Sequence, residues 1–231
     1  MLKLEIWPSF INKSTFELKK SPEGWELIFC KEAYDFMKDP GGFWKANTVD
    51  TSIADKVFEL ACDIVDREIP RTSFGLDGVT SRILLSREGK ETEKNFWSPD
   101  EGSREYRFME LVFQLIDEGI KDPICVNYME LLDQYFFDSF PVKEFDEDPY
   151  RLKIIGGITS NEMEVLDKKM IELKSKPKGI LDMSNFLTTG WALNDTFLQV
   201  QDSQHIEIWV NQASFNYLTQ IGYSPVRLTK K

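Results

Sequence analysis

Residues 150–231 alternate in strict order between short apolar runs and runs with the period of an amphipathic helix. The apolar runs are RLKII, GILDM and HIEIWV, and PVRL is a candidate edge strand after the last helix. Thr159 and Glu162 have the spacing of a capping box at the start of the first helix, which Pro177 ends. Because a β-α-β-α-β-α order needs crossover connections, this part of the chain predicts a small α/β domain with a mostly parallel sheet.

Residues 1–137 follow a different pattern, in which strands and helices are segregated. The stretches LKLEIW, TFELK and GWELIFC alternate like half-buried strands, and a second strand pair turns at Gly89. Apolar stripes predict a helix over 52–67 and an antiparallel helical pair over 103–118 and 122–137. This segregation predicts an α+β domain built from antiparallel strands and a helical pair.

Between these parts, DSFPVKEFDEDP at 138–149 contains two prolines and five acidic residues without a period, which predicts a linker. Residues 1–149 carry 18 Lys and Arg against 31 Asp and Glu, a net charge of −13, whereas residues 150–231 carry 10 against 8, a net charge of +2. An acidic first half repels nucleic acid and anionic membranes, and it favours a basic protein as partner.

The location of the protein is predicted from its cysteines and its apolar runs. Cys30, Cys62 and Cys125 are widely spaced and odd in number, so we expect reduced core thiols. The apolar runs are too short to span a bilayer, and the N-terminus MLKLEIWPSF lacks the pattern of a signal peptide. These features predict a cytoplasmic protein that does not bind membranes.

The ends of two predicted strands in the second half resemble the motifs of a known protein family. In KIIGGITSNEMEVLDKKM, the predicted strand ends in a turn at Gly157, Ile158 and Thr159, and a predicted helix follows. The next predicted strand, in GILDMS, ends in Leu-Asp-Met-Ser, which includes Asp182. Over residues 150–231 the chain thereby resembles the STAS superfamily, the fold of bacterial anti-sigma-factor antagonists. The resemblance implies a STAS-like α/β domain whose role is protein contact rather than catalysis.

The family's regulatory switch is an Asp-Ser-Ser-Gly loop whose second serine is phosphorylated at the start of a helix. The corresponding segment here is LTTG, in which Leu187 replaces the acid and Thr188 and Thr189 replace the serines. We expect SNFLTTG to form a short loop that leads into a helix near Trp191. Either threonine would then be a phosphorylation site favoured by the helix dipole, or an ordinary N-cap without a function.

Two aromatic pairs in the first half are candidate partner contacts. Phe43 and Trp44 follow two glycines in a predicted loop, and Phe96 and Trp97 end a predicted strand. Exposed aromatic residues of this kind anchor interfaces, and the alternative is that they fold back over the sheet. The Asp-Gly turn, the hairpin that ends in FWSPD and the amphipathic helix after it are similar to small bacterial immunity proteins, which neutralise partner toxins.

Residues that would support catalysis are scarce. His205 is the only histidine, so neither a zinc site nor a catalytic triad is expected, and Gly156-Gly157 lacks the rest of a phosphate-binding motif. We therefore predict a non-enzymatic, regulatory or toxin-neutralising interaction protein that needs no cofactor or metal and binds no nucleic acid. The alternatives are a carboxylate-dependent hydrolase with an interdomain cleft, or a small-ligand module using Gly157, Thr159 and Asp182. The oligomeric state stays open.

Overall fold

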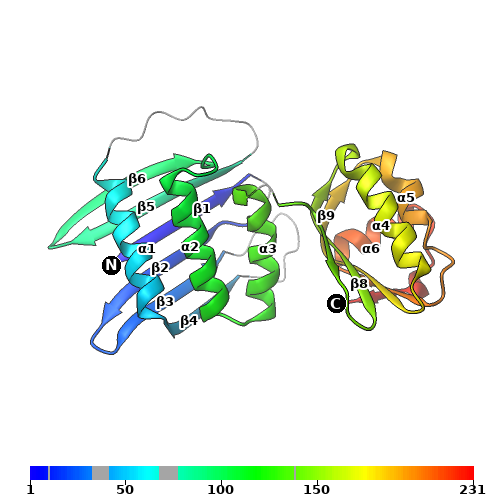
Figure 1. Cartoon of the computed structure of the whole chain (residues 1–231), viewed down its shortest axis with the longest axis horizontal. Helices are drawn as coiled ribbons and strands as arrows, with labels where there is room; N and C mark the ends of the chain where they lie inside the picture. The colour runs from blue at the N-terminus through cyan, green and yellow to red at the C-terminus, as the bar shows by residue number, and fades with distance from the viewer. Residues whose placement is uncertain (10, 33–41, 68–77, 138) are drawn as a thin grey trace. The chain divides into compact units, whose positions relative to one another are not determined.

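The computed structural model describes residues 1–231 except 10, 33–41, 68–77 and 138 (Figure 1). Contacts between Cα atoms divide the chain into two compact units, Met1–Asp138 and Ser139–Lys231. The architecture is mixed α/β, with one antiparallel sheet and one mixed sheet. Within the described residues, every helix is too short or too polar to cross a bilayer.

The N-terminal unit contains a six-stranded antiparallel sheet in the order β4-β3-β2-β1-β5-β6. Its strands are β1 (Leu2–Pro8), β2 (Ser14–Ser21), β3 (Gly24–Lys31), β4 (Phe43–Val49), β5 (Val79–Arg87) and β6 (Lys90–Trp97). Its helices are α1 (Thr51–Val65), α2 (Arg104–Gly119) and α3 (Pro123–Phe137). The predicted strands, hairpin and three helices of this half are confirmed within a few residues at their ends.

Alternation along the strands sends one set of side chains toward the helices and the other set to the opposite face of the sheet. In β1, for example, Leu2, Leu4 and Ile6 are fully buried in one apolar core with residues of α1, α2 and α3. Figure 1 shows these three helices side by side on the same face of the sheet. We call the opposite face, which carries Trp7, Trp44 and the other residues of that set, the outer face.

The C-terminal unit contains a five-stranded sheet in the order β11-β10-β9-β8-β7. Its strands are β7 (Val142–Phe145), β8 (Tyr150–Ile158), β9 (Gly179–Thr189), β10 (Ile206–Val210) and β11 (Leu228–Lys230). Its helical segments are η2 (Ser160–Glu162), α4 (Met163–Ser175), η3 (Trp191–Leu193), α5 (Asn194–Leu198), α6 (Gln212–Gln220) and η4 (Pro225–Arg227). Strands β8 to β11 are parallel, as predicted, and β7 is antiparallel to β8.

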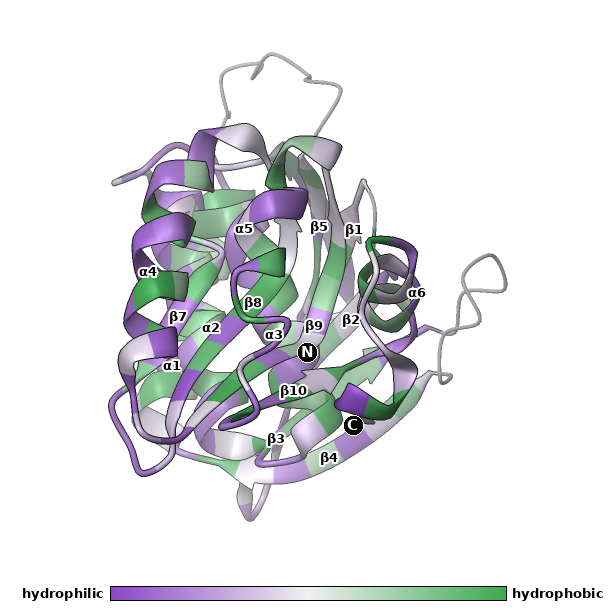
Figure 2. Ribbon diagram, turned by 90° about the vertical axis from the view of Figure 1, so that its right-hand side faces the viewer, coloured by the Kyte–Doolittle hydropathy of each residue, from purple (hydrophilic) through white to green (hydrophobic). Residues whose placement is uncertain are grey.

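Because successive parallel strands are added in one direction, right-handed crossovers place α4, α5 and α6 on one face of this sheet. The buried residues of α4, Leu166, Met170 and Leu173, belong to the same core as Leu152 and Leu181 of the sheet. Figure 2 shows α4 alternating between polar and apolar residues along its length, as expected for a helix with one buried side. The other face of the sheet carries Arg151, Asp182 and Trp209.

Two boundaries differ from the sequence prediction. The predicted linker, 138–149, contains strand β7, because Val142–Phe145 pairs with β8 along its edge. The predicted loop SNFLTTG belongs to β9, which continues to Thr189 and shifts register twice against β8. The first shift moves the core-facing positions from the odd-numbered Leu181 and Met183 to the even-numbered Phe186, so the apolar alternation breaks although the strand continues.

Candidate functional site

The aromatic pair Phe43-Trp44 lies in strand β4, not in a loop, and its two side chains point to opposite faces. Phe43 packs against the core, with its ring centroid 5.7 Å from that of Phe29 and 6.4 Å from that of Tyr128. Trp44 lies on the outer face and is 62% exposed. The two predicted contact residues therefore separate into one core residue and one surface residue.

The pair Phe96-Trp97 divides in the same way at the end of β6. Phe96 is 4% exposed and belongs to the apolar core, so its predicted role as a partner contact is wrong. Trp97 is half-buried on the outer face, where it pairs across strands with Thr80, which in turn pairs with Trp7. Trp7, Trp44 and Trp97 thus share one face of one sheet.

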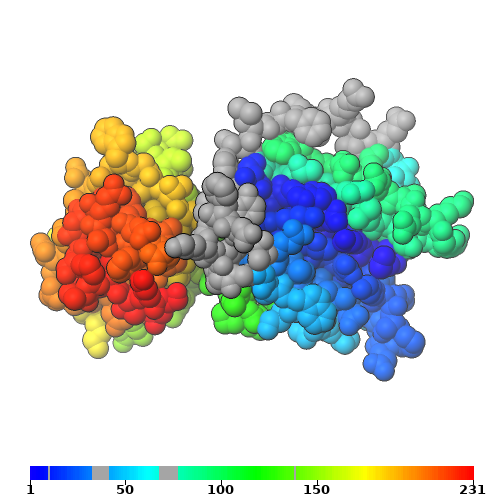
Figure 3. All heavy atoms as spheres, turned by 180° about the vertical axis from the view of Figure 1, so that it is seen from behind, coloured from blue at the N-terminus to red at the C-terminus, as the bar shows by residue number. Residues whose placement is uncertain are grey.

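Charged residues on the outer face pair with one another, within β1 and across β1, β5 and β6. The Glu5 carboxylate lies 3.0 Å from Lys3 Nζ and 3.7 Å from an Arg82 guanidinium nitrogen, and Arg82 also pairs with Glu93. Viewed from behind, blue and teal strand residues form most of the surface of this unit (Figure 3). The outer face therefore combines mutually neutralised charges with exposed aromatic area.

At the carboxyl ends of β8 and β9, the register pairs Gly157 with Thr188 and Ile158 with Thr189. Thr188 is exposed, whereas the Thr189 hydroxyl is buried and has no hydrogen-bond partner among the described residues. The next helical segment, η3, has Gly190 as its N-cap. Neither threonine is an N-cap, because both still belong to the strand that precedes the helical segment.

The other proposed ligand residues lie apart from one another. The Thr159 backbone N–H donates to Glu162 Oε2 at 2.7 Å, and the Thr159 hydroxyl accepts from Asn161 N–H at 3.2 Å, which completes the predicted capping box. Asp182 lies further back along β9, so the structure does not bring it together with Gly157 and Thr159. Gly156-Gly157 lies within β8 and not in a turn, and Gly156 has a φ of 68° beside the second register shift.

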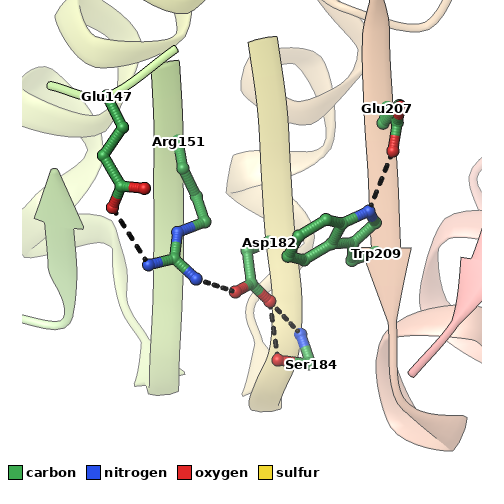
Figure 4. A network of polar contacts seen from close by, with 6 residues as sticks. All are labelled: Glu147, Arg151, Asp182, Ser184, Glu207 and Trp209. Carbon is green, nitrogen blue, oxygen red and sulfur yellow. Dashed lines mark hydrogen bonds and ion pairs between the residues drawn. The ribbon is translucent and has the colours of Figure 1, made fainter. Parts of the chain in front are cut away.

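Asp182 takes part in a polar row across the face of the second sheet that is opposite the helices (Figure 4). It is 3% exposed and accepts hydrogen bonds from Ser184 N–H at 3.0 Å and from Ser184 Oγ at 2.6 Å. Arg151 Nη1 lies 3.8 Å from Asp182 Oδ2, and Arg151 Nη2 lies 3.4 Å from Glu147 Oε1. On β10, the strand beside β9, Trp209 is the register partner of Asp182, and its indole N–H donates to Glu207 Oε2 at 3.1 Å.

Sequence reasoning does not single out Arg151 as a site residue. Arg151 lies in the predicted strand RLKII, where a charged residue between apolar ones is a signal for the second face of a half-covered sheet. Its guanidinium carbon lies 4.1 Å from the centroid of the Phe145 ring, within range of a cation–π interaction. Trp191, expected only as the start of a helix, is 86% exposed, and among the described residues no contact of its ring connects it with this polar row.

The three cysteines are free thiols, of which Cys125 is buried and Cys30 and Cys62 are half-buried. Burial, together with the nearby charge of Asp122, raises the pKa of the Cys125 thiol to about 12, so this cysteine stays protonated at neutral pH. His205 is exposed before β10, with Nε2 3.1 Å from the Lys174 carbonyl oxygen. Among the residues that the structure describes, no group of three or more His, Cys, Asp or Glu side chains is placed to hold a metal ion.

Comparison with known proteins gives this chain no family: no family model matches it, and no curated protein matches it.

Proposed function

We propose that this chain is a non-enzymatic protein-binding protein of a regulatory or toxin-neutralising kind, and that it binds its partner through the outer face of the N-terminal sheet. The observation that carries this proposal is the 62% exposure of Trp44 in a regular strand. Tryptophan is enriched among residues that dominate binding energy, and Trp44 stands on β4, an edge strand of a packed sheet, so its backbone needs no ordering on binding.

The partner that best fits this face presents an apolar pocket for Trp44 inside a basic surrounding. The charges on the outer face pair with one another, as Lys3, Glu5, Arg82 and Glu93 do, so contact there does not require charged residues at the centre. The net charge of −13 over residues 1–149 would attract a basic protein at long range and speed the encounter.

The second unit is proposed to be a STAS-like module with the same kind of role. This proposal is supported by its parallel strands, its helices on one face and its exposed Thr188 at the carboxyl end of β9. A phosphoryl group on Thr188 would project to the surface, whereas one on Thr189 would require the buried hydroxyl to move. The proposed switch residue is therefore Thr188.

The test is capture of a partner from the native host, identification by mass spectrometry, and measurement of Kd with the purified partner. Trp44→Ala is expected to weaken binding by about 30-fold or more, the range of an interface hot spot. Trp191→Ala is the matched control, because it removes an even more exposed indole from the other unit. A Kd that is unchanged by Trp44→Ala, or changed equally by both variants, contradicts the proposed surface.

A further inference from the structure

The guanidinium of Arg151 has more hydrogen-bond donors than the described residues satisfy. Its Nε is buried without a partner, its contact with Glu147 is 3.4 Å long, and its contact with Asp182 is 3.8 Å long. Charge-assisted N–H···O bonds are normally about 2.7–2.9 Å long, so neither carboxylate forms a strong bond with it. An arginine with this many unused donors is suited to receive a further acceptor.

The same guanidinium is held in position from two sides. The Phe145 ring lies against it at 4.1 Å, and the buried Asp182 carboxylate is fixed by two hydrogen bonds from Ser184. The Arg151 side chain nevertheless remains 26% exposed. A guanidinium that is held in position and still partly exposed is suited to donate to a carboxylate or phosphoryl oxyanion.

Further cations lie along the same face. The register places Lys143 of β7 beside Lys153 of β8, and Lys153 beside Asp182 of β9. Lys231 Nζ lies 4.4 Å from the centroid of the Trp209 ring. These cations share the face with the carboxylates of Glu147, Asp182 and Glu207, so its charge is mixed, although the chain as a whole is acidic (Figure 4).

From this geometry we infer that Arg151 is the centre of an oxyanion-binding site, and that Glu147 is its weakly held internal occupant. The Glu147 side chain is 58% exposed and lies in the acidic run Asp146-Glu147-Asp148, just before β8. It reaches the guanidinium with one oxygen only, at a distance that an incoming oxyanion would improve. The ligand class is a carboxylate or a phosphoryl group, which displaces Glu147 and accepts from Arg151 Nη2 in its place.

The site can be tested on the full chain with small anions, without any protein partner. Sodium phosphate and sodium acetate are titrated at constant ionic strength, and the signals of Arg151 Nε–H and of the Trp209 indole N–H are followed by NMR. Trp209→Phe assigns the indole signal. Saturation by both anions indicates that a carboxylate suffices, and saturation by phosphate alone indicates a phosphoryl ligand.

Three variants decide whether the response belongs to this site. Glu147→Gln removes the competing carboxylate. It is expected to tighten anion binding by about 3-fold or more, because the anion no longer has to displace a charged group. Arg151→Lys keeps the charge beside Asp182 but loses the fork, and it is expected to weaken binding about tenfold. Lys168→Gln, which removes a cation ion-paired on α4, is the charge control and should have no effect.

Non-saturating shifts with both anions would overturn the inference. So would equal affinities of the wild type and Arg151→Lys, or no tightening by Glu147→Gln. Because the probes are inorganic phosphate and acetate, these results do not depend on Trp44 or on the proposed partner.

Discussion

Asn211 connects the start of α6 to the irregular part of β9, and its removal tests the account of that strand. Its side-chain oxygen accepts from Ser214 N–H at 2.9 Å, which caps the helix. Its Nδ2 donates to the carbonyl oxygens of Ser184 at 3.0 Å and Phe186 at 2.7 Å. Strand β10 ends at Val210, so it does not continue alongside these carbonyl groups of β9.

The expected cost of Asn211→Ala is the sum of these losses. Removing an N-cap costs about 1 kcal/mol, and each lost hydrogen bond to a carbonyl costs about 0.5–1.5 kcal/mol, which gives about 2–4 kcal/mol in total. Asn211→Asp keeps the cap but cannot donate to Ser184 and Phe186, so it should lose about 1–3 kcal/mol. Asn216→Ala, at an exposed position of the same helix, should change stability by less than about 0.5 kcal/mol.

Native-state hydrogen exchange is the suitable assay, because it reports on each strand and helix separately. Amides of β9 near Ser184–Leu187 and of the first turn of α6 should exchange faster in Asn211→Ala, while those of β1 and β2 should not change. Urea unfolding followed by circular dichroism gives the total loss. An Asn211→Ala protein within 0.5 kcal/mol of the wild type, with unchanged exchange in β9, would refute the assigned role of this side chain.

Three further predictions follow from burial, charge and backbone geometry. The Ser81 hydroxyl is fully buried and has no hydrogen-bond partner among the described residues, so Ser81→Ala should raise the melting temperature. Ser214→Ala loses a 2.9 Å bond to the Met183 carbonyl and should lower the melting temperature. Calorimetry compares the two variants, and a lower melting temperature for Ser81→Ala than for the wild type contradicts the reasoning. Cys125 has a folded-state pKa of about 12, so above about pH 9 only the unfolded chain releases this proton. Stability should therefore fall as pH rises from 9 to 11, and less steeply in Cys125→Ala; equal slopes in urea unfolding would show that the thiol is not responsible. Gly156→Ala should lower the free energy of unfolding by about 1–2 kcal/mol, because the φ of Gly156 is 68°. Gly157→Ala should be tolerated, because the new Cβ would lie at an ordinary contact distance of 3.6 Å from Thr188 Cγ2. Thermal melts in which Gly157→Ala is the less stable variant contradict this.

Elements with an uninterrupted period could be predicted from the sequence. The helix predicted over 52–67 is α1, Thr51–Val65, and the parallel order of the second unit follows from its alternating strands and helices. Both depend on local patterns that tertiary packing reinforces. The capping box of Thr159 and Glu162 is also local, since both of its hydrogen bonds close within four residues.

The misplaced features depend on partners distant in sequence. Strand β7 has too short a pattern to stand out from an acidic, proline-containing segment, and it exists because β8 supplies its hydrogen bonds. The end of β9 was misread because a bulge reverses which residues face the core. Phe96 and Trp97 look alike in the sequence, and only their register against β5 separates a core residue from a surface residue.

The two register shifts in β9 also bear on how the length of this chain can vary. In a regular strand, the loss of one residue turns every following side chain to the other face of the sheet. In β9, the strand advances three residues between Asp182 and Asn185 while β8 advances two, and it advances two between Phe186 and Thr188 while β8 advances one. A chain that lacked Leu187 would keep Thr188 and Thr189 opposite their present partners. Leu187 is therefore an interior position where relatives of this protein are expected to tolerate a one-residue deletion.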